Sequence, residues 1–96
     1  MQKDKHITKM MFRKFKNDGS IIALFPYELY NEKLYGDSMI ESYMHLGQHS
    51  GVDYLGVLQD TRPATKAESR ALKAELKGLG YNIKTVFKRT NRKKKS

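Results

Sequence analysis

A chain of 96 residues is long enough for one small domain and too short for two separate cores. Lys and Arg number 19 against 10 Asp and Glu, so the formal net charge is +9 at pH 7. The absence of cysteine excludes a disulfide scaffold, a thiolate metal site and a cysteine nucleophile. No apolar run approaches the ~20 residues of a membrane span, and the first residues lack the apolar stretch of a signal peptide. These features predict a basic, cytoplasmic domain with no membrane partner.

The positive charge is concentrated at the two ends of the chain. Residues 1–16 carry six basic residues and one acid, residues 88–96 carry six basic residues and no acid, and residues 17–87 carry seven basic and nine acidic residues. A near-neutral body with two cationic ends indicates a polyanionic partner, and nucleic acid is the first candidate. A terminal basic run is also typical of a solvated tail. We therefore expect a single domain over 1–88 and a disordered basic tail over 89–96.

The first part of the chain predicts a β-hairpin. Residues 7–16 combine aromatic and β-branched side chains, residues 17–19 (Asn-Asp-Gly) fit a short hairpin turn, and residues 20–25 are almost continuously apolar. The apolar run is typical of a central strand that is covered on both sides. Pro26 is expected to end this strand, because proline cannot donate a hydrogen bond to a neighbouring strand.

The middle of the chain predicts a loop, a third strand and a turn. Residues 27–37 are polar and rich in tyrosine, which favours a long loop. Residues 38–46 alternate between two faces, as a strand does, and residues 47–51 (Gly-Gln-His-Ser-Gly) are expected to turn. Residues 52–59 fit either a strand or a short helix, and we prefer the helix.

The clearest local signal is a helix that begins at Thr65. Glu68 follows three residues later and completes a capping box, while Leu72, Leu76 and Leu79 recur at helical spacing. This places Arg70, Lys73 and Lys77 toward water, and Gly78 and Gly80 supply the stop. Residues 81–88 alternate again and predict the last strand. The order β-β-β-α-α-β therefore predicts an α+β fold, with a mostly antiparallel sheet of about four strands and one main helix on one face.

Two histidines and a nearby carboxylate are the candidates for catalysis or metal binding. His45, His49 and Asp53 could in principle form an acid–base centre, with Asp53 or Glu41 orienting a ring, or could bind zinc or iron. Histidines four residues apart form a ligand pair only on a continuous helix face, whereas this segment resembles a strand that enters a turn. We therefore favour a structural role for them, and we expect no metal and no cofactor.

Basic residues interleaved with aromatic residues give the stronger functional argument. Phe12, Phe15 and Phe87 lie among lysines and arginines, and we interpret these rings as core and the cations as a wet face for phosphate contact. The candidate nucleic-acid-binding residues are Lys9, Arg13, Lys14, Lys16, Lys84, Lys88, Arg89, Arg92, Lys93, Lys94 and Lys95. This use requires the first and last strands to lie close together, so that their cations share one surface.

Four segments resemble a family of short bacterial and bacteriophage proteins. They are Phe12–Lys16 (Phe-Arg-Lys-Phe-Lys), the run Ile-Ala-Leu-Phe-Pro at 22–26, the segment Ser-Tyr-Met-His-x-Gly-Gln-His at 42–49, and Thr-Arg-Pro-Ala-Thr at 61–65. The resemblance covers about residues 10–88. It implies the cytoplasm of a bacterial host and no known activity, so it assigns no catalytic residue.

The sequence leaves three functional hypotheses. The leading one is a small accessory protein that binds DNA or RNA mainly through backbone electrostatics. The second is a module that binds a host or virion protein through the tyrosine-rich loop at 27–35. The third is a hydrolase or nuclease centred on His45, His49 and Asp53.

Overall fold

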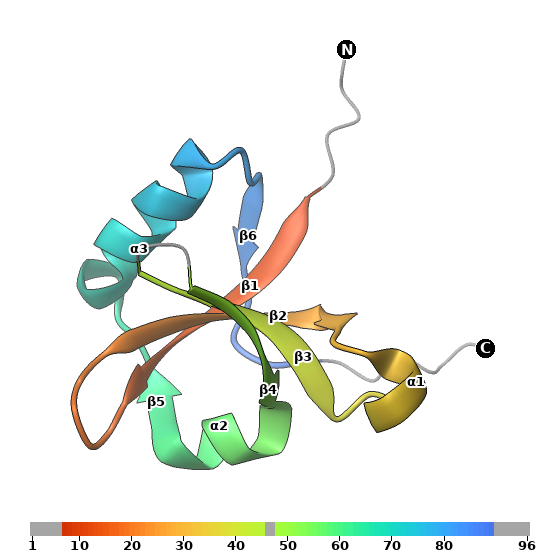
Figure 1. Ribbon diagram of the computed structural model, residues 1–96. Coiled ribbons are helices and arrows are strands. Elements are labelled where there is room, and N and C mark those ends of the chain that lie inside the picture. The colour runs from red at the N-terminus through yellow and green to blue at the C-terminus, as the bar shows by residue number, and fades with distance from the viewer. Residues whose placement is uncertain (1–6, 46–47, 90–96) are drawn as a thin grey trace.

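The computed structural model describes residues 7–45 and 48–89, and Figure 1 shows their arrangement. Within these residues it has six strands: β1 (Thr8–Phe15), β2 (Ile21–Leu29), β3 (Met39–Met44), β4 (Gln48–Asp53), β5 (Thr61–Pro63) and β6 (Ile83–Thr85). The helices there are α1 (Glu32–Tyr35), α2 (Tyr54–Asp60) and α3 (Lys66–Gly78). The α+β class is therefore confirmed. No helix in this part of the chain is long and apolar enough to cross a membrane.

The sheet is mixed and larger than the sequence indicates. Its order is β4-β3-β2-β1-β5, and β6 also pairs with β1 (Figure 1). The pairings along this path are antiparallel, whereas β6 runs parallel to β1. The expectation of about four strands did not include β4 and β5. β5 has only three residues, too few for a periodic pattern, and it becomes a strand by pairing with β1.

The expected turn at 47–51 is wrong over most of its length. Residues 48–53 form β4, which pairs residue by residue with β3 from Gln48 opposite Met44 to Asp53 opposite Met39. The ladder to β3 outweighs the low strand propensity of Ser50 and Gly51. The preferred helix after it is confirmed, although α2 begins at Tyr54 rather than at residue 52.

The predicted hairpin between β1 and β2 is confirmed. Gly19 has a φ of 77°, and its N–H donates to the carbonyl of Phe15, while the N–H of Phe15 donates to the carbonyl of Ser20. Pro26 does not end β2, which continues to Leu29. The register between β2 and β3 shifts after Phe25, and a proline is tolerated at such an irregularity because no ladder donor is required there. The expected loop at 27–37 accordingly holds the end of β2 and the short helix α1.

Both faces of the sheet are buried, which corrects the expectation of cover on one face. Neighbouring residues of β1 point in opposite directions, so that Met10 and Phe12 pack under α3 while Met11 packs toward α2. The cluster under α3 comprises Met10, Phe12, Ala23, Phe25, Tyr43, Ala64, Leu72 and Leu76. The cluster on the other face comprises Met11, Ile22, Leu24, Ile40 and Tyr54. Double-sided burial explains why the alternation of β1 looks imperfect in the sequence.

The capping box of α3 is confirmed. The N–H of Glu68 donates to the Thr65 hydroxyl at 3.1 Å, and the N–H of Thr65 donates to the Glu68 carboxylate at 2.9 Å. Leu72 and Leu76 are buried, whereas Leu79 lies just beyond the helix and is 57% exposed. The last strand is shorter than expected, since β6 covers only Ile83–Thr85.

Candidate nucleic-acid interface

The first and last strands lie side by side, as the electrostatic hypothesis requires. β6 runs along β1, and Lys84 stands opposite Lys9 in the register. Paired residues of neighbouring strands point to the same face of a sheet, so these two lysines share a surface. Both residues are exposed, and Lys9 Nζ lies 5.2 Å from the ring centroid of Tyr27.

Arg13 makes internal contacts instead of facing solvent. Its Nε donates to the hydroxyl of Thr61 at 2.9 Å, and its Nη2 donates to the carbonyls of Thr61 at 2.9 Å and Leu58 at 3.2 Å. Burial lowers the pKa of Arg13 from its ordinary value. This guanidinium therefore ties β1 to the end of α2 and the start of β5.

Lys14 points to the other face of β1, where it contacts Glu68 of α3. Its Nζ donates to the Glu68 carboxylate at 2.9 Å, and Arg62 donates to both oxygens of the same carboxylate at 2.9 and 2.7 Å. The hydrogen bonds from Arg62, Thr65 and Lys14 hold the pKa of Glu68 well below its ordinary value. Glu68 thus joins β1, β5 and the N-terminus of α3.

The candidate cations at the ends of the domain have different surroundings. Lys16 is exposed beyond the far end of β1, and its Nζ donates to the carbonyl of Gln59 at 3.3 Å. Lys88 is exposed beyond β6. Arg89 is only 14% exposed in its side chain; it stacks 4.5 Å from the Tyr54 ring centroid and donates to the carbonyl of Asp37. The remaining candidates, Arg92, Lys93, Lys94 and Lys95, lie outside the described residues.

Two of the three predicted core rings lie inside the domain. Phe12 is buried under α3, and Phe15 is half-buried on the opposite face. Phe87 is instead 68% exposed, beside Lys88. An exposed ring next to a cation suits stacking on a base, which the two inner rings cannot provide.

The structure separates Asp53 from the two histidines, because Asp53 stands opposite Met39 at one end of β3 and His45 follows Met44 at the other end. Asp53 ends β4, four residues from His49, and this separation along a strand is about 13 Å. The His49 ring packs edge-on against Tyr43, with 4.7 Å between centroids. Within the described residues, no group of three His, Asp or Glu side chains is placed to hold a metal.

His45 has a carboxylate partner that sequence reasoning missed. Its Nδ1 lies 2.6 Å from one oxygen of Glu75, and the Tyr43 hydroxyl donates to the other at 2.5 Å. A carboxylate bound to one ring nitrogen orients a histidine for proton transfer at the other. The His45 side chain is 73% exposed. Glu75 lies 30 residues from His45 in the sequence, so only the packing of α3 on the sheet places the two together.

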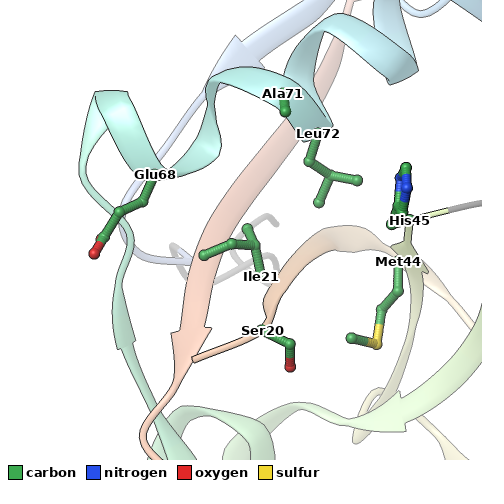
Figure 2. Close-up of a pocket in the computed structure, with 7 residues that line it drawn as sticks. All are labelled: Ser20, Ile21, Met44, His45, Glu68, Ala71 and Leu72. Atoms are coloured by element: carbon green, nitrogen blue, oxygen red, sulfur yellow. The ribbon is translucent and has the colours of Figure 1, made fainter. Parts of the chain in front are cut away.

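A cleft of about 300 Å³ opens between α3 and the ends of β2 and β3 (Figure 2). Its apolar lining comes from Ile21, Met44, Ala71 and Leu72, and its polar lining comes from Ser20, His45 and Glu68. The Ser20 hydroxyl donates to Asp18 in the hairpin turn. The Glu68 carboxylate accepts hydrogen bonds from Lys14, Arg62 and the backbone N–H of Thr65. The cleft therefore presents one oriented histidine beside apolar walls.

Comparison with known proteins assigns no family to the chain. No protein-family model, no curated protein and no solved structure matches it. The resemblance to short bacterial and bacteriophage proteins therefore stays a prediction.

Proposed function

We propose that the chain is a small accessory protein of the bacterial cytoplasm that binds nucleic acid through the phosphate backbone. Its contacts are the exposed cations at the ends of β1 and β6 together with the basic residues at the C-terminus. These are Lys9, Lys16, Lys84, Lys88, Arg92, Lys93, Lys94 and Lys95. Arg13, Lys14 and Arg89 contribute indirectly, because they are partly buried and bind partners within the domain.

The observation that supports this proposal most is the pairing of Lys9 with Lys84. Like charges that stand opposite each other on neighbouring strands repel and reduce stability. Neither lysine forms an ion pair with a carboxylate among the residues that the structure describes. Phosphates would relieve this repulsion, since each one placed between the two ammonium groups attracts both.

The test is a salt titration of binding to labelled DNA and RNA, followed by fluorescence anisotropy. Each neutralised phosphate of a DNA duplex contributes about −0.9 to the slope of log K against log salt, so eight contacts predict a slope of about −7. Lys84→Gln should reduce the magnitude of the slope of log K against log salt by about 0.9. Lys33→Gln, which removes the same charge from the exposed face of α1, is the matched control and should leave the slope unchanged. Absence of binding to both nucleic acids at about 50 mM salt would refute the proposal.

A second candidate function is binding of a protein partner at α1. Leu34 and Tyr35 of α1 and Tyr30 just before it are exposed, and the two tyrosine rings stack with their centroids 6.4 Å apart. Exposed aromatic and apolar side chains that gather on one element are typical of protein interfaces. A partner captured from nuclease-treated lysate should be lost with Leu34→Ser and retained with Lys84→Gln; the reverse pattern would exclude α1.

A further inference from the structure

The charges of α3 are separated onto opposite flanks of the helix. Its four cations, Lys66, Arg70, Lys73 and Lys77, are spaced by four, three and four residues. At about 100° per residue, they fall within about 60° of one another around the helix axis. Its two acids, Glu68 and Glu75, lie about 180° from the cations. We call the first set the basic flank and the second, Glu68 and Glu75, the acidic flank.

The acidic flank is occupied by contacts within the domain. Glu68 binds Lys14 and Arg62, while Glu75 binds Tyr43 and His45. These bonds turn the acidic flank toward the sheet and fix the rotation of the helix about its axis. The basic flank is therefore held in one orientation by residues that do not belong to it.

The basic flank has no carboxylate partner among the described residues. Lys66, Arg70 and Lys77 are exposed, and Lys73 Nζ lies 5.5 Å from the ring centroid of Phe12. A shallow depression of about 280 Å³ runs along this flank, lined by the four cations with Ser69 and Ala74.

The spacing of these cations and the position of Lys66 work against the stability of the helix. Like charges three and four residues apart repel, and a cation in the first turn opposes the helix dipole, as Lys66 does. Lys73 contacts the Phe12 ring and Lys77 complements the dipole in the last turn, but no contact within the domain accounts for Lys66 and Arg70, whereas a polyanionic ligand accounts for the whole row.

We infer that the basic flank of α3 binds the phosphate backbone of a nucleic-acid duplex. The inference deepens the proposed function and rests on it, by adding a second surface to the ends of β1 and β6. The flank is about 17 Å long at 1.5 Å per residue, and phosphates of one duplex strand recur every ~3.4 Å along the axis, so the four cations span about five of them.

The surroundings of the flank favour a duplex over a single strand. Proteins that bind single strands stack bases on exposed aromatic rings. The side chains that line the depression include no ring, and Phe12 beneath Lys73 is buried. A rigid, ring-free row of cations is suited to a rigid backbone. DNA and RNA duplexes both present one.

The experiment compares single-charge variants in the full chain. Arg70→Gln and Lys77→Gln should each lower the steepness of the salt dependence for a duplex of about 20 base pairs by about 0.9, and the fourfold Gln variant of the basic flank by about 3.6. Lys33→Gln loses one charge outside both surfaces and should have no such effect. Circular dichroism melting should show that the fourfold variant stays folded at the temperature of the titration, since the relief of like-charge repulsion offsets the loss of the Lys73 contact with Phe12 and of the favourable charge of Lys77 in the last turn.

The possible results separate this inference from the proposed function. If binding of the wild type falls steeply with salt, but Arg70→Gln has the same slope of log K against log salt as Lys33→Gln, the binding surface on α3 is refuted while the proposed function stands. If the fourfold variant loses as much slope on single strands as on duplexes, the assignment to a duplex is refuted. Parallel titrations with DNA and RNA duplexes show which nucleic acid the basic flank binds. A smaller slope for the fourfold variant than for the wild type, with either duplex, supports the inference.

Discussion

Truncation of Leu76 tests the orientation of α3, on which the placement of its charges depends. Leu76 is fully buried in the cluster between α3 and the sheet, with Phe25 and Tyr43 in the same cluster. Leu76→Ala removes three carbon atoms from a close-packed site and leaves a cavity, which costs about 2–5 kcal/mol for a buried leucine. For a domain of 96 residues, one kcal/mol shifts Tm by about 4–8 °C, so a loss of about 3 kcal/mol lowers Tm by roughly 15 °C.

Leu79→Ala supplies the matched control for this experiment. The same atoms are removed three residues later, from a side chain that is 57% exposed, so the free energy of unfolding should change by less than about 1 kcal/mol. Urea unfolding followed by circular dichroism measures both values. Equal losses for the two variants would mean that α3 does not present Leu76 to the sheet, and the division into a basic and an acidic flank would then be wrong.

Three further substitutions test other parts of the structure. Hydrogen bonds from Arg62, Thr65 and Lys14 lower the pKa of Glu68 in the folded state, so the ionised carboxylate stabilises the fold at pH values above its ordinary pKa of 4.5. The Tm of the wild type should therefore exceed the Tm of Glu68→Gln at about pH 6, and this difference should shrink as the pH falls to about 3. Gly51→Ala places a Cβ 2.3 Å from ring atoms of Tyr30, so it should displace that ring and change the near-ultraviolet circular dichroism of the tyrosines. Gly78→Ala meets no atom within 4 Å and should raise the free energy of unfolding by about 0.5–1 kcal/mol in urea titrations. The explanation for Glu68 is wrong if the Tm difference does not depend on pH. The explanations for Gly51 and Gly78 are wrong if the tyrosine signal and the free energy of unfolding, respectively, stay unchanged.

The features predicted correctly from the sequence are those set by local chemistry. The hairpin turn follows from the ability of Gly19 to adopt a positive φ, and the start of α3 follows from the reciprocal bonds of Thr65 and Glu68. Both signals occupy a few consecutive residues and need no partner from elsewhere in the chain. The class of the fold follows from the order of such elements.

The features that were missed depend on contacts between distant segments. β4 and β5 are strands because β3 and β1 offer them unpaired backbone groups, and their own residues carry little strand propensity. The contact between His45 and Glu75 was missed for the same reason, since it too joins distant segments. Glu75 was not connected with His45, because the contact exists only once α3 packs across the sheet. The spacing of the basic flank was readable from the sequence, but its lack of acidic partners was not.

Apart from Lys14, which binds Glu68 within the fold, the cations of this domain divide by chemistry as well as by position. Arg13, Arg62 and Arg89 bind carbonyl or carboxylate oxygens within the fold, and each uses the planar guanidinium to contact more than one group. The exposed cations near β1 and β6 are lysines instead, whose ammonium groups are mobile point charges. Multiple fixed hydrogen bonds suit a contact that must hold the fold together. A mobile ammonium group suits binding to a nucleic-acid backbone at many alternative positions, because the lysine side chain can adjust to phosphates in different geometries. Arg70 is the one arginine of the basic flank. Its guanidinium can donate two hydrogen bonds to a single phosphate, so we expect its binding to depend most on the geometry of the nucleic-acid backbone.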